Sequence, residues 1–259
     1  MNGNSSLVRR GTAASVALLI VVLAAWQWGP GLLGIPTFII PPLSAVFDEF
    51  LRMLAVSALM THTGVTALEV IAGFLLGSLL GAFFGYVLGM SPTAEFALSP
   101  YILALQIAPK VAFAPLFILW MGFTLYPKIL VAILIVFFPV MVNVLTAIRT
   151  VDPDLVNLAR AFKATRAQIF WKIEFPASLP PLFAGLRIAS TLAVVGVVVG
   201  ELVGGNLGLG YLLAFGEGQA NTAMVFNAIV LLTLVGIVLY AVVAAIEARV
   251  LHYVPRAMR

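Results

Sequence analysis

The chain has 259 residues, of which 63% are hydrophobic and 9% are charged, and its mean hydropathy is +1.14. In ordinary soluble domains roughly a quarter of the residues are charged. This composition therefore excludes an ordinary soluble domain and indicates an integral membrane protein. The absence of cysteine excludes disulfides, thiolate metal sites and thiol nucleophiles. The net charge of +4 is informative mainly through the positions of the cations along the chain.

Six apolar runs are long enough to cross a bilayer as helices. They cover residues 11–28, 61–89, 94–122, 125–148, 180–202 and 224–250. A cleaved signal peptide is the alternative for the first run, but Trp26 and Trp28 stand where cleavage needs small residues, which favours a membrane anchor. Pro109 and Pro115 predict a broken third span, and Pro139 predicts a kink in the fourth.

Glycines recur every fourth residue in the second run and therefore share one helix face. They are Gly73, Gly77, Gly81, Gly85 and Gly89. A face without Cβ atoms lets another backbone approach closely. We therefore expect this face to pack against a neighbouring helix, either in the same chain or in a second copy of it.

Lysines and arginines gather before the first run, between the fourth and fifth runs, and after the sixth. The positive-inside rule then predicts that both termini and the 149–179 loop lie on the cytoplasmic side. Residues 1–10 would form a cytoplasmic tail, and residues 11–259 a single transmembrane domain. The loops expected on the outer side before the fifth span hold only Arg52 and Lys128 as cations.

Residues 152–176 are the one stretch that does not resemble a membrane span, and they carry four of the fourteen lysines and arginines. Asp152 is a good N-cap for a first short helix. Thr165 with Gln168 has the spacing of a capping box and predicts a second short helix, which Pro176 would end. The first helix has an apolar stripe formed by Leu155, Leu158, Ala159 and Phe162.

Three interpretations of this hairpin are possible. A DNA-binding helix-turn-helix is disfavoured, because the segment is anchored in the membrane at both ends and has no helix rich in base-reading residues. A hairpin that only packs on the spans is the simplest alternative. A docking element for a soluble partner protein best explains an apolar stripe on a charged loop.

The hairpin resembles the coupling loop of the permeases of ABC importers, the binding-protein-dependent family. The family signature is Glu-Ala-Ala, three residues, Gly, nine residues, then Ile, any residue, Leu-Pro. The corresponding residues here are Asn157, Leu158, Ala159, Lys163, Ile173, Phe175 and Pro176. The spacing is kept and four identities differ. Lys163 stands where the family has glycine, so it must either adopt a left-handed conformation or let the turn relax.

The flanking segments VDPDL, APLFILWMGF, LPPLFAGLRIA and VVGELVG resemble the subfamily that imports nitrate, alkanesulfonates, taurine or thiamine-precursor pyrimidines. The resemblance implies an all-α bacterial inner-membrane permease with six transmembrane helices and a cytoplasmic coupling-helix hairpin between spans four and five. The residues implied to contact the ATPase are Asp154, Leu155, Asn157, Leu158, Ala159, Arg160, Phe162, Lys163, Ala164 and Thr165.

The resemblance also implies the partners: two ATPase subunits, a second and most simply identical permease chain, an extracytoplasmic substrate-binding protein, membrane lipid, and no nucleic acid. The sequence contains no G-x-x-x-x-G-K-[ST], so ATP and Mg²⁺ are expected on the partner ATPase and no cofactor on this chain. His62 and His252 lack the spacing of metal ligands, and no nucleophile with a base is evident. We therefore expect a transport subunit and not an enzyme.

Several residues near membrane depth are candidates for the translocation path. They are Glu69, Gln106, Lys110, Trp120 and Glu201. A charge in hydrocarbon is costly, so Lys110 is expected either to attract an anionic substrate or to pair with Glu69 or Glu201. The alternative function is a secondary carrier or channel driven by an ion gradient. That class is expected to show internal repeats or paired broken helices, and we find no convincing repeat between 60–150 and 150–250.

Overall fold

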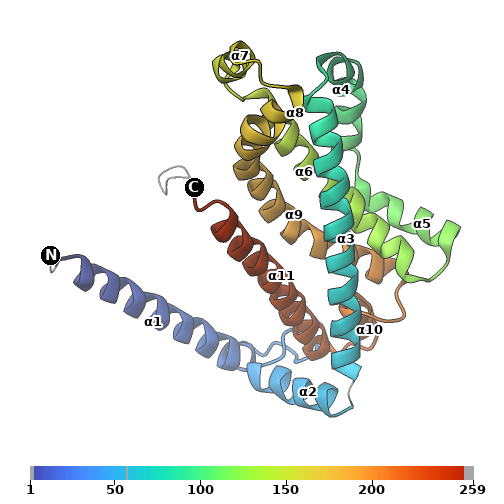
Figure 1. Ribbon diagram of the computed structural model, residues 1–259. Helices are drawn as coiled ribbons and strands as arrows, with labels where there is room; N and C mark the ends of the chain where they lie inside the picture. Colours follow the sequence, from blue (N-terminus) through green and yellow to red (C-terminus); the bar gives the residue numbers. More distant parts are fainter. Residues whose placement is uncertain (1–2, 57, 254–259) are drawn as a thin grey trace. The chain divides into compact units, whose positions relative to one another are not determined.

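The computed structural model describes residues 3–56 and 58–253, in which every regular element is a helix (Figure 1). The elements in chain order are α1 (Gly3–Leu32), α2 (Leu43–Ala55), α3 (Ala58–Gly89), α4 (Pro92–Ile107), η1 (Lys110–Phe113), α5 (Ala114–Met121), α6 (Leu125–Arg149), α7 (Pro153–Ala161), α8 (Arg166–Ile169), η2 (Phe170–Glu174), α9 (Phe175–Gly204), α10 (Leu209–Gly218) and α11 (Thr222–Val250). The chain forms two compact units, Met1–Thr61 with Leu212–Val230, and His62–Tyr211 with Leu231–Arg259.

The first unit contains α1, α2, most of α10 and the first turns of α11. Trp26, near the end of α1, donates its indole N–H to Pro41 O over 3.0 Å. Asn227 in α11 donates to Val46 O in α2 over 2.9 Å. The short helix α2 buries Val46 and Met53, so it lies at the centre of this unit's polar and apolar contacts.

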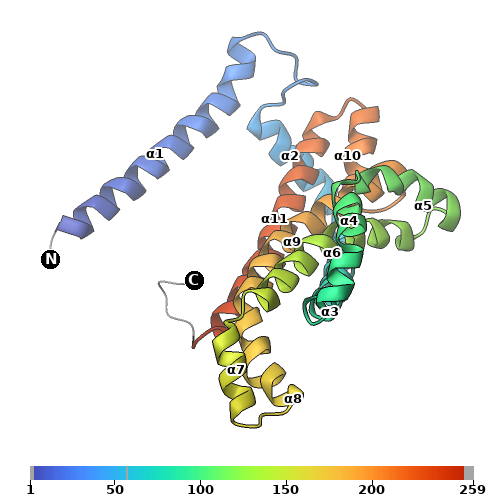
Figure 2. The same cartoon turned by 90° about the horizontal axis from the view of Figure 1, so that it is seen from above.

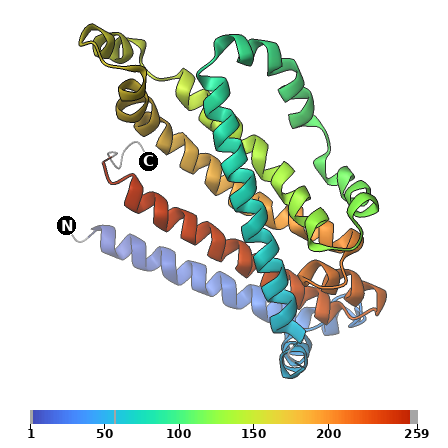
Figure 3. The same cartoon turned by 45° about the vertical axis from the view of Figure 1, so that its right-hand side comes forward.

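The second unit is built on α3, α6 and α9, together with most of α11, from Leu231 onward. Figure 2 shows α6 and α9 running side by side, and Figure 3 shows α3 crossing them. Their shared core consists mainly of small and β-branched side chains. It contains Val70, Phe74, Ala132, Val136, Val140, Val144, Phe183, Ala189, Ala193, Val197, Val243 and Leu251.

In this core, the backbones of α3 and α9 approach α6 closely from two sides. The glycines of α3 that face α6 are Gly73, Gly77, Gly81, Gly85 and Gly89. A Cβ atom added at Gly81 would lie 2.6 Å from Phe137 O. From α9, a Cβ added at Gly200 would lie 2.8 Å from Lys128 Cα. Such contacts are possible only where one of the two helices has no side chain.

The third span is broken, as Pro109 predicted. α4 and the segment Lys110–Met121 are bent by 79° at this break. Pro109 has no N–H to donate and disfavours helical geometry at Ala108, whose ψ is 137°. Pro115 does not contribute to the break, because it lies in the first turn of α5, where a missing N–H costs little.

Five described helices are long and apolar enough to cross a membrane, and the bent pair makes six if it counts as one span. This agrees with the six predicted spans and with the all-α fold class. The prediction that Pro176 ends the hairpin was wrong, because α8, η2 and α9 form one continuous helical run from 166 to 204. The run passes Pro176 through a π-helical turn, η2, which leaves Pro176 in the first turn of α9.

Candidate functional site

The polar hairpin between α6 and α9 is built by local capping interactions. Asp152 Oδ1 accepts a hydrogen bond from Asp154 N over 2.9 Å and starts α7. The predicted capping box is confirmed, since Gln168 N donates to Thr165 Oγ1 over 3.3 Å and Thr165 N donates to Gln168 Oε1 over 2.8 Å. Both helices therefore start where the sequence signals predict.

Lys163 adopts the left-handed conformation, with a φ of 57°. Lys163 N donates to Arg160 O over 2.8 Å, and Ala164 N donates to Ala159 O over 3.0 Å. These two bonds are the pair that closes a helix in the Schellman motif, in which the residue after the C-cap is usually glycine. A lysine can make the same turn at a cost of roughly 1 kcal/mol.

The apolar stripe of α7 is open to the surroundings. The side chains of Leu155, Leu158 and Phe162 are 51%, 55% and 80% exposed. Ala159 and Ala164 are half-buried, whereas the polar members of the predicted contact set are all exposed. A short helix that turns three large apolar side chains outward is typical of a protein-binding surface.

Glu69 and Glu201 lie in a buried polar cluster at the end of the second unit opposite α7. The structure corrects the prediction for their partner, because neither pairs with Lys110. Lys128 Nζ is 2.9 Å from Glu69 Oε1, and Lys128, which the sequence placed in an exposed loop, is only 3% exposed. The first turn of α6 starts at Leu125 and carries Lys128 into the core, between α3 and α9.

Hydrogen bonds join this cluster to the segment that follows α9. Thr66 Oγ1 donates to Glu201 Oε1 over 2.6 Å, and Gly210 N donates to Glu201 Oε2 over 2.6 Å. Leu209 N donates to Thr66 Oγ1 over 2.7 Å. Gly208 N donates to His62 Nδ1 over 2.9 Å. Residues on α3 and α9 therefore hold the start of α10 in place.

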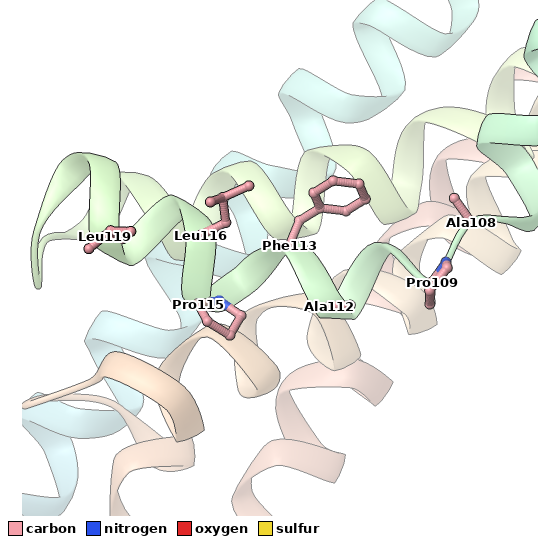
Figure 4. Close-up of a pocket in the computed structure, with 7 residues that line it drawn as sticks. All are labelled: Ala108, Pro109, Ala112, Phe113, Pro115, Leu116 and Leu119. Atoms are coloured by element: carbon pink, nitrogen blue, oxygen red, sulfur yellow. The ribbon is translucent and has the colours of Figure 1, made fainter.

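The other three candidates for the translocation path lie along the broken third span. Lys110 Nζ donates to Gln106 O over 2.5 Å and lies 4.9 Å from the centre of the Phe138 ring. Gln106 and Trp120 are exposed. A hollow of about 530 Å³ at this break is lined by apolar side chains (Figure 4). Its lining residues are Ala108, Pro109, Ala112, Phe113, Pro115, Leu116 and Leu119.

Sequence reasoning missed Lys128 and Thr66 as members of the buried cluster. A signal for Thr66 was present, because Thr66 and Glu69 lie seven and four residues before Gly73 and so continue the glycine face of α3. For Lys128 the corresponding signal is its spacing of four residues from Ala132, which packs on that face. Within the described residues, no group of three or more His, Cys, Asp or Glu is placed to hold a metal ion.

Residues 73–252 match the family described as the binding-protein-dependent transport system inner membrane component, which covers more than half of the chain. The chain belongs to this family of permeases. The riboflavin transport system permease protein RibX of Chloroflexus aurantiacus is 37% identical over 229 residues, with 88% of this chain and 85% of RibX covered. The putative aliphatic sulfonates transport permease protein SsuC of Bacillus subtilis is 33% identical over 245 residues, with 95% and 89% covered.

The fold agrees with the family. An inward-facing structure of the MetNI methionine ABC transporter contains a chain with a TM-score of 0.64 and 20% identity, which covers 76% of this chain and 97% of that one. The protein is therefore a transport subunit of an ABC importer and not an enzyme, and this assignment decides against the secondary carrier. The permease is a multi-pass inner-membrane protein, and its family works with an ATPase and a substrate-binding protein.

Proposed function

We propose that the permease forms the translocation path for a small anionic or heterocyclic solute. Support comes from relatives named for the transport of riboflavin, aliphatic sulfonates and formylaminopyrimidine. A homodimer with two ATPase subunits is the simplest assembly, because one chain carries one coupling hairpin and closed two-fold pairs are the commonest oligomers. The cation distribution favours cytoplasmic positions for both termini and for the hairpin.

The hairpin would couple the permease to its ATPase, and the exposed apolar side of α7 is the observation that carries this proposal. Leu155, Leu158 and the C-cap residue Phe162 share one side of α7 at helical spacing, and all three are exposed. In a cleft of the ATPase these side chains would leave water, and about 25 cal/mol would be gained per Å² of apolar surface buried. The Schellman turn at Lys163 fixes the end of α7 relative to α8, so a push on α7 would be passed through α8 and η2 into α9.

Replacing Leu158 with aspartate is expected to release the ATPase. The substitution puts an unpaired charge into the apolar contact, where the cost of desolvation corresponds to at least about a tenfold loss of affinity. Co-purification of the ATPase with the permease, together with transport by reconstituted vesicles, measures the effect. Leu158 is exposed in the permease, so the thermal stability of the isolated permease should stay unchanged.

Asn157→Glu is the matched control for this experiment. Asn157 belongs to the set implied to contact the ATPase, but it is exposed on the side of α7 away from the apolar stripe, and the change adds the same single negative charge. It also restores the glutamate of the family signature. We expect this variant to bind the ATPase and to transport normally. Normal co-purification and transport by Leu158→Asp would contradict docking through this side of α7.

Lys110 is proposed to attract an anionic substrate at the break of the third span. Its partners in the structure are a backbone carbonyl and an aromatic ring, and no carboxylate of residues 3–56 and 58–253 forms an ion pair with it. Lys110→Met should leave the complex folded, because no buried charge loses its partner. If the substrate contacts this charge, transport should fall by roughly tenfold or more, since a hydrogen bond to a charged group contributes about 1.5–3 kcal/mol.

Lys110→Arg is the control, because it keeps the positive charge and should retain most of the transport activity. Uptake of a labelled anionic solute and thermal melting in detergent are the measurements. A stable Lys110→Met variant with the transport rate of the native permease would show that Lys110 does not contact the substrate.

A further inference from the structure

The cluster at the ends of α3, α6 and α9 contains more negative than positive side chains. Glu69 and Glu201 are 0% and 1% exposed, and Lys128 is 3% exposed. His62 adds no charge, because its Nδ1 accepts the hydrogen bond from Gly208 N, and a ring nitrogen that accepts a hydrogen bond carries no proton. With both carboxyl groups ionised, the cluster would carry a net charge of −1 out of contact with water.

One carboxylate oxygen in the cluster has no donor. Glu69 Oε1 accepts a hydrogen bond from Lys128 Nζ. The two oxygens of Glu201 accept hydrogen bonds from Thr66 Oγ1 and Gly210 N. Glu69 Oε2 is fully buried and receives no hydrogen bond. A buried acceptor that is left unsatisfied costs about 1–3 kcal/mol, and more when the group is charged.

The two carboxyl groups are neighbours in the fold. Thr66, which donates to Glu201, lies one helical turn before Glu69 on α3, and Lys128, which donates to Glu69, packs against Gly200 beside Glu201. Two neighbouring ionised carboxylates repel each other, and in a site of low dielectric constant the repulsion is much stronger than in water. The positive charge of Lys128 compensates one of the two negative charges, that of Glu69, with which it forms an ion pair. The negative charge without a cation is therefore that of Glu201.

We propose that this cluster is a binding site for one proton, which the carboxyl group of Glu201 carries and donates to Glu69 Oε2. The proton makes the cluster neutral, with Glu69 ionised against Lys128 and Glu201 uncharged. The same proton also gives Glu69 Oε2 the hydrogen-bond donor that it otherwise lacks. The oxygens of a protonated carboxyl group can still accept the bonds from Thr66 and Gly210.

This proton has a structural consequence for the segment after α9. Lys128 Nζ also lies 3.4 Å from Leu207 O, and Glu201 holds Gly210 N. The neutral cluster thus fastens residues 207–210 to α3, α6 and α9 at one point. The proposal concerns the charge state of this cluster and does not depend on the substrate or on the docking of α7.

Infrared spectroscopy of the purified permease–ATPase complex in an ester-free detergent tests the proposal. A protonated carboxyl group absorbs through its C=O stretch, apart from ionised carboxylates. The difference spectrum between the native permease and Glu201→Gln should show one such band, which shifts slowly in heavy water because the group is buried. Asp48→Asn, at an exposed carboxylate of α2, is the control and should show none.

Two further variants test the balance of charge. In Glu69→Gln the band should also vanish, because Lys128 is then free to compensate an ionised Glu201. In Lys128→Met the band should grow, since both carboxyl groups must then take up protons. Glutamine resembles a protonated glutamate in shape and charge, so Glu201→Gln should still assemble with the ATPase. Its amide nitrogen cannot accept the hydrogen bond that one oxygen of Glu201 accepts, so a lower melting temperature is expected.

Two results would overturn the proposal. If the native spectrum and the Glu201→Gln spectrum have the same absorption in this region, both carboxylates are ionised and no proton is bound. If the band persists in Glu69→Gln, the proton does not balance the charge of the pair. Loss of substrate transport in any of these variants bears only on the function proposed above.

Discussion

Replacing Gly81 of α3 with leucine is expected to destabilise the permease strongly. Even a Cβ atom at this position would lie 2.6 Å from Phe137 O and 3.0 Å from Val140 Cβ. The obstacle at Phe137 is backbone, so it cannot move away as a flexible side chain could. Overpacking of a core typically costs about 1–3 kcal/mol, and the upper part of this range is expected here.

Gly64→Leu is the matched control, since Gly64 lies on the same helix and an added Cβ would meet nothing within 4 Å. Both changes raise the helix propensity of α3 by the same amount, so the difference between them isolates the contact with α6. Melting temperature in detergent and the yield of assembled complex are the measurements. Equal melting temperatures for the two variants would show that the face of Gly81 does not pack against α6 in the membrane.

Lys128→Met is the second change with a large expected effect. It removes the cation that pairs with Glu69, and breaking a buried ion pair in this way typically costs about 3–5 kcal/mol. Methionine has nearly the length of lysine, so the loss reflects charge and not an empty cavity. A lower melting temperature and poorer assembly with the ATPase are therefore expected.

A second substitution should reverse the effect. In the double variant Lys128→Met with Glu69→Gln, and with Glu201 protonated as proposed above, no charge is left without a partner, and most of the stability should return. Lys172→Met is the control, because Lys172 is exposed and the chemical change is identical. If Lys128→Met melts at the same temperature as this control, the ion pair with Glu69 does not stabilise the permease.

The broken span and the hairpin show what local chemistry determines. Pro109 removes a donor and restricts Ala108, so the bend follows from two adjacent residues. The capping box of Thr165 and Gln168 likewise needs only residues within one helical turn. The glycine spacing of α3 also indicated a packing face. It did not indicate which helix packs there, because any apolar helix of sufficient length satisfies the same pattern.

Pro176 and Lys110 show where local reasoning failed. Pro176 was expected to end a helix, but it lies in the first turn of α9, directly after a π-helical turn, and the helical run continues to Gly204. Lys110 was expected either to attract an anionic substrate or to pair with Glu69 or Glu201, and the structure shows neither of these pairs. The partner of Glu69 is instead Lys128, 59 residues away along the chain.

The sequence by itself determined the membrane class, the six spans, the break in the third and the start of each hairpin helix. Each of these depends on hydropathy over a long window or on hydrogen bonds within a few residues. Only the tertiary structure decided that α6 packs between the glycines of α3 and those of α9, and that Lys128 meets Glu69 there. These choices depend on the distances between helix backbones, because a buried charge takes the nearest opposite charge that the packing brings to it.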